Sequence, residues 1–176
     1  MPQSPPPDPA SPLSAEVVAT VSSTLSQLGV DFEQPQRGTF VAVLPGERKL
    51  RTTVSLVVGA HSLTVNAFVV RRPDENVEGC YRWLLLHNAK HPGIAFGVDQ
   101  LGDVYLVGQL PLDAVTSTTL DALLGRVLET ADTSFNILLE LGFASSIRRE
   151  WAWRVSRGES LANLAAFTHL VDTDDT

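Results

Sequence analysis

Hydrophobic positions near the start of the chain recur at the spacing of a helix. In the segment "LSAEVVATVSSTLSQLG", Val17, Val21, Leu25 and Leu28 lie three or four residues apart, which places them on one face of an α-helix. The hydroxyl of Ser14 is positioned to cap the N-terminus of this helix, and Gly29 can take the left-handed conformation that ends it. The pattern predicts one amphipathic helix with a single buried stripe.

The period then changes to two, which is typical of strands. Three runs, "TFVAVLP", "KLRTTVSLVVG" and "SLTVNAFVV", are separated by turn-length segments, so consecutive strands should pair antiparallel. The second run gives the clearest alternation, with one face formed by Leu50, Thr52, Val54, Leu56 and Val58. We therefore expect a three-stranded meander.

A second helix is expected over residues 75–91, with Asp74 as its cap and Pro92–Gly93 as its end. Its apolar stripe consists of Val77, Cys80, Tyr81, Leu84 and Asn88, with Leu85 beside it. The following runs "IAFGV" and "DVYLVGQLP", joined through "DQLG", predict a hairpin in which Gly102 takes a positive φ.

Residues from Asp113 onward are expected to be helical for a long stretch. The stripe contains Leu120, Leu123, Leu124, Val127, Leu128, Ala131, Phe135 and Leu138, and Gly142 marks a stop. Ile147, Trp151 and Val155 then predict a short fourth helix, with a break near Gly158 and a last turn around Leu161 to Phe167.

The order helix, three strands, helix, two strands, long helix, C-terminal helix predicts an α+β fold. It lacks the regular strand-helix alternation of a doubly wound sheet, so we expect an antiparallel sheet of about five strands with helices over its apolar face. The predicted divisions are a disordered proline-rich tail (1–12), an α+β domain (13–142), a C-terminal helical extension packed on the domain (143–170) and an acidic tail (171–176).

Composition narrows the function. The formal net charge of −7 disfavours nucleic acid as a partner, because phosphate binding needs a basic face. No secretory signal and no apolar run long enough to span a bilayer are present in the sequence. The single cysteine excludes an intramolecular disulfide. We expect a cytoplasmic protein that does not bind membranes.

The stretch "YRWLLLHNAKHP" carries the most suggestive chemistry. His87 and His91 have the spacing of helical metal ligands, but His91 precedes Pro92, which disrupts helical geometry, and Asn88 stands where a zinc-protease helix has glutamate. Helix-end residues are the favoured interpretation. Cys80 is a nucleophile only if a histidine lies near it, and its place on the apolar stripe favours a small core residue. No cofactor, metal or catalytic residue is predicted.

Basic and aromatic residues cluster in "RREWAWRVSR" near the C-terminus. Arginine and tryptophan are enriched at interface hot spots. Trp151 lies on the apolar stripe of the predicted fourth helix, whereas Trp153 lies off it. The alternatives are a partner surface and a solvated, salt-bridged face. The candidate partner surface consists of Arg148, Arg149, Trp153, Arg154 and Arg157.

The stretch from "YRWLLLHNAKHPGIAFGVD" through the hairpin "DQLGDVYLV", the entry "LPLDAV" and the long helix after it resembles the YbjN family, which shares its fold with type III secretion chaperones. The match covers roughly residues 75 to 135, and the C-terminal segment looks like an extension of an actinobacterial branch. This resemblance implies the same α+β order and a non-enzymatic relative of dimeric chaperones that bind client segments. Many YbjN members are described only as sensory-transduction regulators.

These features leave three functions open. The first is a non-enzymatic protein-binding module, a chaperone-like or regulatory adaptor that forms a homodimer and uses a sheet edge or helix surface. The second is a small-molecule sensor or enzyme with a pocket between sheet and helices near Tyr81, Arg82 and His87. Nucleic-acid binding through the arginine cluster ranks last because of the net charge.

Overall fold

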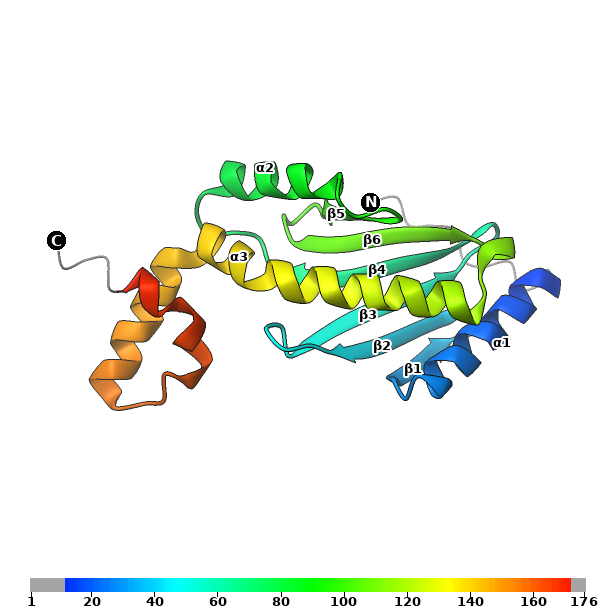
Figure 1. The fold of residues 1–176 in the computed structure, drawn as a ribbon, viewed down its shortest axis with the longest axis horizontal. Helices are drawn as coiled ribbons and strands as arrows, with labels where there is room; N and C mark the ends of the chain where they lie inside the picture. The colour runs from blue at the N-terminus through cyan, green and yellow to red at the C-terminus, as the bar shows by residue number, and fades with distance from the viewer. Residues whose placement is uncertain (1–11, 172–176) are drawn as a thin grey trace.

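Six antiparallel strands form one sheet with helices on one of its faces (Figure 1). The computed structural model describes residues 12–171. The predicted N-terminal tail lies outside this range except for Pro12, which begins a helix, and so does the predicted acidic tail from residue 172 onward. The elements are α1 (Pro12–Gln27), β1 (Asp31–Gln36), β2 (Thr39–Pro45), β3 (Arg51–Val58), β4 (Ser62–Val70), α2 (Val77–Asn88), β5 (Ile94–Val98), β6 (Val104–Pro111), η1 (Leu112–Ala114), α3 (Ser117–Arg157) and η2 (Ala162–Leu170).

The spatial order of the strands is β1-β2-β3-β4-β6-β5. Strands β2, β3 and β4 form the predicted meander, with Ala42 opposite Val54 and Val54 opposite Ala67. The predicted hairpin of β5 and β6 joins the meander through β6, which pairs antiparallel with β4. The two predicted strand groups therefore make one continuous sheet, and the α+β order expected from the sequence is confirmed.

The sheet has one strand more than predicted. Strand β1, "DFEQPQ", pairs with β2 at the edge of the sheet. It was missed because most of its residues are polar and exposed, so the sequence shows no alternation. Pro35 is tolerated there because an edge strand leaves some N–H groups unpaired.

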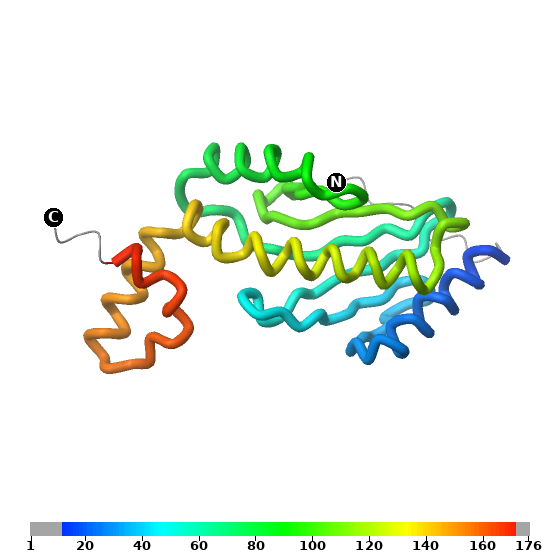
Figure 2. The backbone as a smooth tube through the Cα atoms, in the orientation of Figure 1, coloured from blue at the N-terminus to red at the C-terminus, as the bar shows by residue number. Residues whose placement is uncertain are grey.

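Alternate positions of the central strands face the helices and are buried. Val54, Leu56, Val65, Ala67 and Leu106 are each 0% exposed. Helix α3 runs across the middle of this face, with α1 beside β1 and β3 and α2 beside β5 (Figure 2). Helix α3 begins where Thr116 and Thr119 exchange hydrogen bonds in a capping box. The predicted apolar stripes of the helices therefore meet the apolar face of the sheet.

Three details of the first half differ from the prediction. Ser14 does not cap α1, because the helix already begins at Pro12, and the buried Ser14 hydroxyl has no hydrogen-bond partner among the described residues. Leu28 follows the end of α1 and is 42% exposed. Leu50 precedes β3 and is 72% exposed, so it does not share the buried face of that strand. In each case the real element begins or ends a few residues from the predicted boundary.

Helix α2 is shorter than predicted, spanning residues 77–88 in place of 75–91. Its N-cap is Asn76 in a left-handed conformation, and Asp74 does not cap it because the Asp74 carboxylate binds other groups. Gly102 takes the predicted positive φ, at 91°, and Gly29 and Gly158 do so at 66° each.

The predicted stop at Gly142 is a kink and not the end of a helix. Phe143 has non-helical dihedral angles, φ −143° and ψ 16°, and α3 then continues to Arg157. Residues 144–157 and η2 fold back on each other beyond the sheet, and we call residues 144–171 the C-terminal hairpin (Figure 1). Phe167, in the predicted last turn, is the buried residue of η2, at 4% exposure.

Candidate functional site

The kink in α3 fixes the direction of the C-terminal hairpin. Because Phe143 breaks the helix, the carbonyl of Gly142 is available to other donors. It accepts hydrogen bonds from the backbone N–H groups of Asp74, at 3.0 Å, and Glu75, at 3.2 Å. The connection between β4 and α2 is thereby fastened to the kink.

Two carboxylates of the same connection bind the helix after the kink. Glu75 accepts hydrogen bonds from the Ser145 backbone N–H, at 2.6 Å, and from its hydroxyl, at 2.8 Å, and these bonds lower the pKa of Glu75. Asp74 is bound by the Arg71 guanidinium, which lowers its pKa most, and by the Ser146 hydroxyl at 3.0 Å. The N–H group left free by the break is therefore capped from outside the helix.

Two of the predicted surface arginines hold the hairpin together. Arg148 donates through Nε to the Leu170 carbonyl at 2.8 Å, which ties η2 to α3. Arg154 donates to the Glu150 carboxylate at 2.7 Å and to the Ser160 carbonyl at 3.0 Å. These side chains are engaged within the chain.

The other three predicted residues, Arg149, Trp153 and Arg157, are exposed to solvent. The Arg157 guanidinium lies 5.2 Å from the ring centre of Trp153, which is 46% exposed. Trp151 is partly buried. A shallow hollow beside this group is lined by Ser146, Arg149, Glu150 and Trp153. We call Arg149, Trp153 and Arg157 the hairpin surface.

A larger apolar surface lies on helix α2. Leu85 is 71% exposed and Leu86 is 60% exposed. Together with Val77 and Tyr81 they form what we call the α2 outer face, a groove whose lining also includes Glu78 and Arg82. Val77, Tyr81 and Leu85 are spaced i, i+4, i+8, so they form one stripe along the helix. Contiguous exposed apolar patches, unlike single exposed leucines, mark interaction surfaces, so this groove is a candidate for one.

Sequence reasoning placed Leu85 beside the buried stripe and overlooked this surface. The signal was present in "LLL", residues 84–86, because three consecutive residues of a helix point in directions about 100° apart. Only Leu84, at 3% exposure, reaches the core. The other two had to face outward or sideways.

The inner side of α2 accounts for the suggestive polar cluster. The Asn88 side chain accepts from the Phe96 N–H, at 2.6 Å, and donates to its carbonyl, at 3.2 Å, so it pairs with strand β5. The ring of His87 stacks on Trp83 and its Nδ1 lies 2.8 Å from the Trp83 carbonyl. His91 lies beyond the helix, edge-on to Phe96. The two histidines therefore take separate structural positions.

Cys80 occupies the core position expected for it. It is 0% exposed, and burial raises the pKa of its thiol, which disfavours the reactive thiolate. The histidines are spread over the fold, with His61 in the β3–β4 turn and His169 in η2. Tyr81 and Arg82 line the α2 outer face, while the ring of His87 stacks on Trp83.

Among residues 12–171, no group of three or more histidine, cysteine, aspartate or glutamate side chains is arranged to hold a metal ion. Within the same residues, no helix has the length and apolar character needed to cross a membrane.

Proteins from mycobacteria are similar in sequence to most of this chain. An uncharacterized protein of Mycobacterium tuberculosis strain H37Rv, Rv0487, is 57% identical over 133 residues, which cover 76% of this chain and 73% of that protein. An uncharacterized protein of Mycobacterium leprae, ML2442, is 53% identical over 134 residues, with the same coverage of 76% and 73%.

Solved structures share the fold at low sequence identity. The ExsC–ExsE complex contains a chain with a TM-score of 0.55 and 22% identity, matched over 72% of this chain and 96% of that one. The ExoU–SpcU complex from the type III secretion system of Pseudomonas aeruginosa contains a chain with a TM-score of 0.51 and 15% identity, matched over 70% of this chain and 98% of that one. YbjN from E. coli has a TM-score of 0.50 and 16% identity, matched over 67% of this chain and 87% of that one.

The family model that matches is YbjN, described as "Putative bacterial sensory transduction regulator", and it spans residues 18–140. This region runs from α1 to the part of α3 just before the kink, so it contains the whole sheet and α2. The helix after the kink and η2 lie beyond it. The fold is that of YbjN and of the type III secretion chaperones, and the chain belongs to the YbjN family.

Proposed function

We propose that this protein is a non-enzymatic protein-binding module, a chaperone-like or regulatory adaptor that works as a cytoplasmic homodimer. The observation that carries the proposal is the α2 outer face, where Leu85 and Leu86 are 71% and 60% exposed. Covering a leucine side chain that is otherwise exposed is favourable by about 1.5 to 3 kcal/mol. The fold leaves this energy available to a partner.

The chemistry of the α2 outer face suits an amphipathic protein segment. Its apolar stripe is flanked by Glu78 and Arg82, which provide one charge of each sign at the rim. A central apolar patch with a polar rim is the usual anatomy of a protein interface. One helix face is smaller than the roughly 1,200 to 2,000 Å² that a stable interface buries, so adjoining surfaces must contribute.

The hairpin surface is the second proposed contribution. Arg149, Trp153 and Arg157 are exposed and combine an aromatic ring with two guanidinium groups, the side chains that most often dominate binding energy. The ExsC–ExsE and ExoU–SpcU structures are complexes of two proteins, which supports a protein partner for this fold. The family description as a regulator supports the same role.

The test uses the double variant Leu85→Glu/Leu86→Glu. Its matched control is Leu50→Glu/Leu101→Glu, because Leu50 and Leu101 are 72% and 74% exposed but lie in loops. We expect sedimentation velocity at tens of micromolar to show dimers for the wild type and the control, and monomers for the α2 variant. In a quantitative pull-down from native cytosol, the wild type and the control should recover a protein partner. The α2 variant should not recover that partner.

Wild-type protein that is monomeric at tens of micromolar would contradict the homodimer. Equal partner recovery by the two double variants would contradict the α2 outer face as the working surface. The triple variant Arg149→Ala/Trp153→Ala/Arg157→Ala tests the second surface, because it keeps the internal bonds of Arg148 and Arg154 and loses one exposed hydrogen bond, from Arg149 to Ser146. Full partner recovery by this variant would remove the hairpin surface from the proposal.

A further inference from the structure

A mainly apolar cleft of about 550 Å³ lies where the end of β4, helix α3, η2 and the β2–β3 loop meet. Its lining includes eight apolar and four polar residues. The apolar walls come largely from Phe68, Val70, Phe135, Leu139, Ile147 and Leu164. A volume of this size is within the range of about 300 to 1,000 Å³ typical of small-molecule sites.

Lys49 places an ammonium group in the wall of this cleft. Its Nζ lies 5.3 Å from the ring centre of Phe68 and 5.2 Å from that of Phe135. Burial lowers the pKa of Lys49. No carboxylate within residues 12–171 lies at ion-pair distance from this nitrogen, so its charge faces two aromatic rings without a negative partner.

The other charged groups of the cleft are already paired. The Arg71 guanidinium binds the Asp74 carboxylate at 2.7 Å and stacks 4.6 Å from the ring centre of Phe143. The Glu150 carboxylate accepts from Arg154 at 2.7 Å. Among the described residues that line the cleft, Lys49 is therefore the one charged side chain with no opposite charge beside it.

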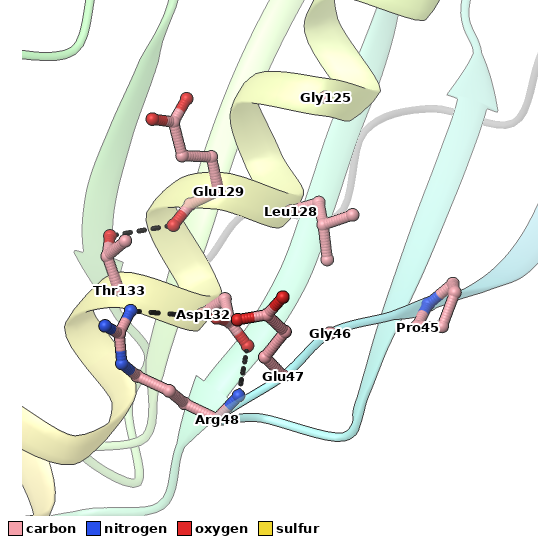
Figure 3. A pocket seen from close by; sticks show the side chains of 9 residues that line it. All are labelled: Pro45, Gly46, Glu47, Arg48, Gly125, Leu128, Glu129, Asp132 and Thr133. Atoms are coloured by element: carbon pink, nitrogen blue, oxygen red, sulfur yellow. Dashed lines mark hydrogen bonds and ion pairs between the residues drawn. The ribbon is translucent and has the colours of Figure 1, made fainter.

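The loop that carries Lys49 is held in place by helix α3. Asp132 accepts hydrogen bonds from the backbone N–H groups of Arg48, at 2.8 Å, and of Lys49, at 2.9 Å. Figure 3 shows both the backbone and the side chain of Arg48 reaching toward Asp132. A Cβ at Gly46 would lie 2.6 Å from the Asp132 carboxylate, so glycine permits this close approach. The lysine is presented by a preformed loop.

From this arrangement we infer that the cleft binds an alkyl carboxylate, a molecule of the fatty-acid type, with its carboxylate on Lys49 and its chain along the apolar walls. A carboxylate supplies the negative partner that the Lys49 ammonium lacks. The resulting ion pair is stronger where water is partly excluded. An alkyl chain brings no polar groups into the cleft. A peptide segment would bring N–H and C=O groups that apolar walls leave unsatisfied.

Isothermal titration calorimetry on the full chain tests the inference with decanoate as the ligand and 1-decanol as its uncharged counterpart. Wild-type protein should bind one decanoate per chain. Lys49→Met keeps the aliphatic stem and should weaken decanoate binding about tenfold, while decanol binding stays unchanged. Lys49→Arg should restore most of the affinity. Lys90→Met is the matched control, since Lys90 is the other lysine of the chain, is exposed, follows the end of α2 and does not line the cleft.

The location is tested by Leu139→Phe, which narrows the cleft and should weaken decanoate and decanol alike. Unfolding curves of each variant establish that it is folded before titration. The inference is overturned if Lys49→Met binds decanoate as the wild type does, if Leu139→Phe has no effect, or if several decanoates bind per chain. Tighter binding of N-acetyl-trileucine than of decanoate would replace the alkyl ligand by a peptide terminus.

Discussion

At the scale of single residues, the kink in α3 depends on a missing side chain. A Cβ at Gly142 would lie 2.8 Å from Pro73 Cβ and 3.1 Å from Cys80 Sγ. The former approach is shorter than real Cβ contacts allow, so the β4–α2 connection would have to move. The sequence indicated a special role for Gly142 but assigned it to a helix end, because a glycine stop and a glycine contact look the same in one sequence.

Gly142→Ala should therefore destabilise the protein by about 1 to 3 kcal/mol, the usual range for overpacking a tight contact. The control is Gly125→Ala in the same helix, where an added Cβ meets nothing within 4 Å. That substitution should stabilise by about 0.5 to 1 kcal/mol, because alanine favours the helix over glycine. Urea unfolding of both variants measures the difference. Equal effects at the two positions would mean that the contact at Gly142 is unimportant.

The bond from Glu75 to Ser145 predicts a dependence on pH. The pKa of Glu75 is lowered in the folded protein. Between the lowered and the ordinary pKa, the folded state therefore binds fewer protons than the unfolded state. The stability that this carboxylate contributes is full above its ordinary pKa and is lost as pH falls through the lowered value. Glu75→Gln should lower the urea midpoint at pH 7, and the difference from wild type should be smaller at pH 3 than at pH 7.

Glu33→Gln, in the exposed edge strand β1, is the matched control and should leave the urea midpoint close to wild type at both pH values. A midpoint for Glu75→Gln that follows the wild-type curve throughout the titration would show that the Ser145 bond contributes no stability. The pH dependence distinguishes this bond from a packing effect. A variant that only perturbed packing would lower the urea midpoint by a similar amount at every pH, and its difference from wild type would not narrow at low pH.

At the scale of elements, the strands that could be predicted are those with one buried face. Strands β3 and β4 alternate clearly between buried and exposed positions, and the packing of one face imposes that period. Strand β1 could not be found because the edge of the sheet buries little of it. Likewise the end of α2 was misplaced, since the sequence does not reveal that Asn88 turns to pair with Phe96 of β5.

Phe167 is the buried residue of η2, at 4% exposure, and we expect it to contribute to the association of η2 with the helix after the kink. Phe167→Ala should release η2 locally, because removing a buried phenylalanine costs about 3 to 5 kcal/mol, more than a short 3₁₀ segment can lose. Hydrogen exchange should then accelerate in residues 162–170 while the sheet strands keep their protection. Loss of protection throughout the sheet would instead mean that the C-terminal hairpin and the sheet unfold together.

At the scale of the whole molecule, the sequence pointed to one of the two candidate surfaces. The arginine cluster was found from composition, but Arg148 and Arg154 turn out to bind Leu170 and Glu150. The α2 outer face was missed, because whether a leucine is covered depends on which neighbours the fold brings to it. Exposure is a property of the tertiary structure, and one sequence without its fold gives only the period of the pattern.

The distribution of charge over the whole chain yields the last prediction, which concerns nucleic acid. The chain has a formal net charge of −7, and Arg71, Arg154 and Arg48 are paired with Asp74, Glu150 and Asp132. The hairpin surface therefore offers two exposed arginines, Arg149 and Arg157, and two phosphate contacts give little counterion release.

Fluorescence anisotropy with a labelled 20-base-pair duplex should detect no saturable binding, even at about 50 mM salt. Saturable binding that weakened steeply with added salt and disappeared in Arg149→Ala/Arg157→Ala would contradict this and make the hairpin surface a phosphate-binding face.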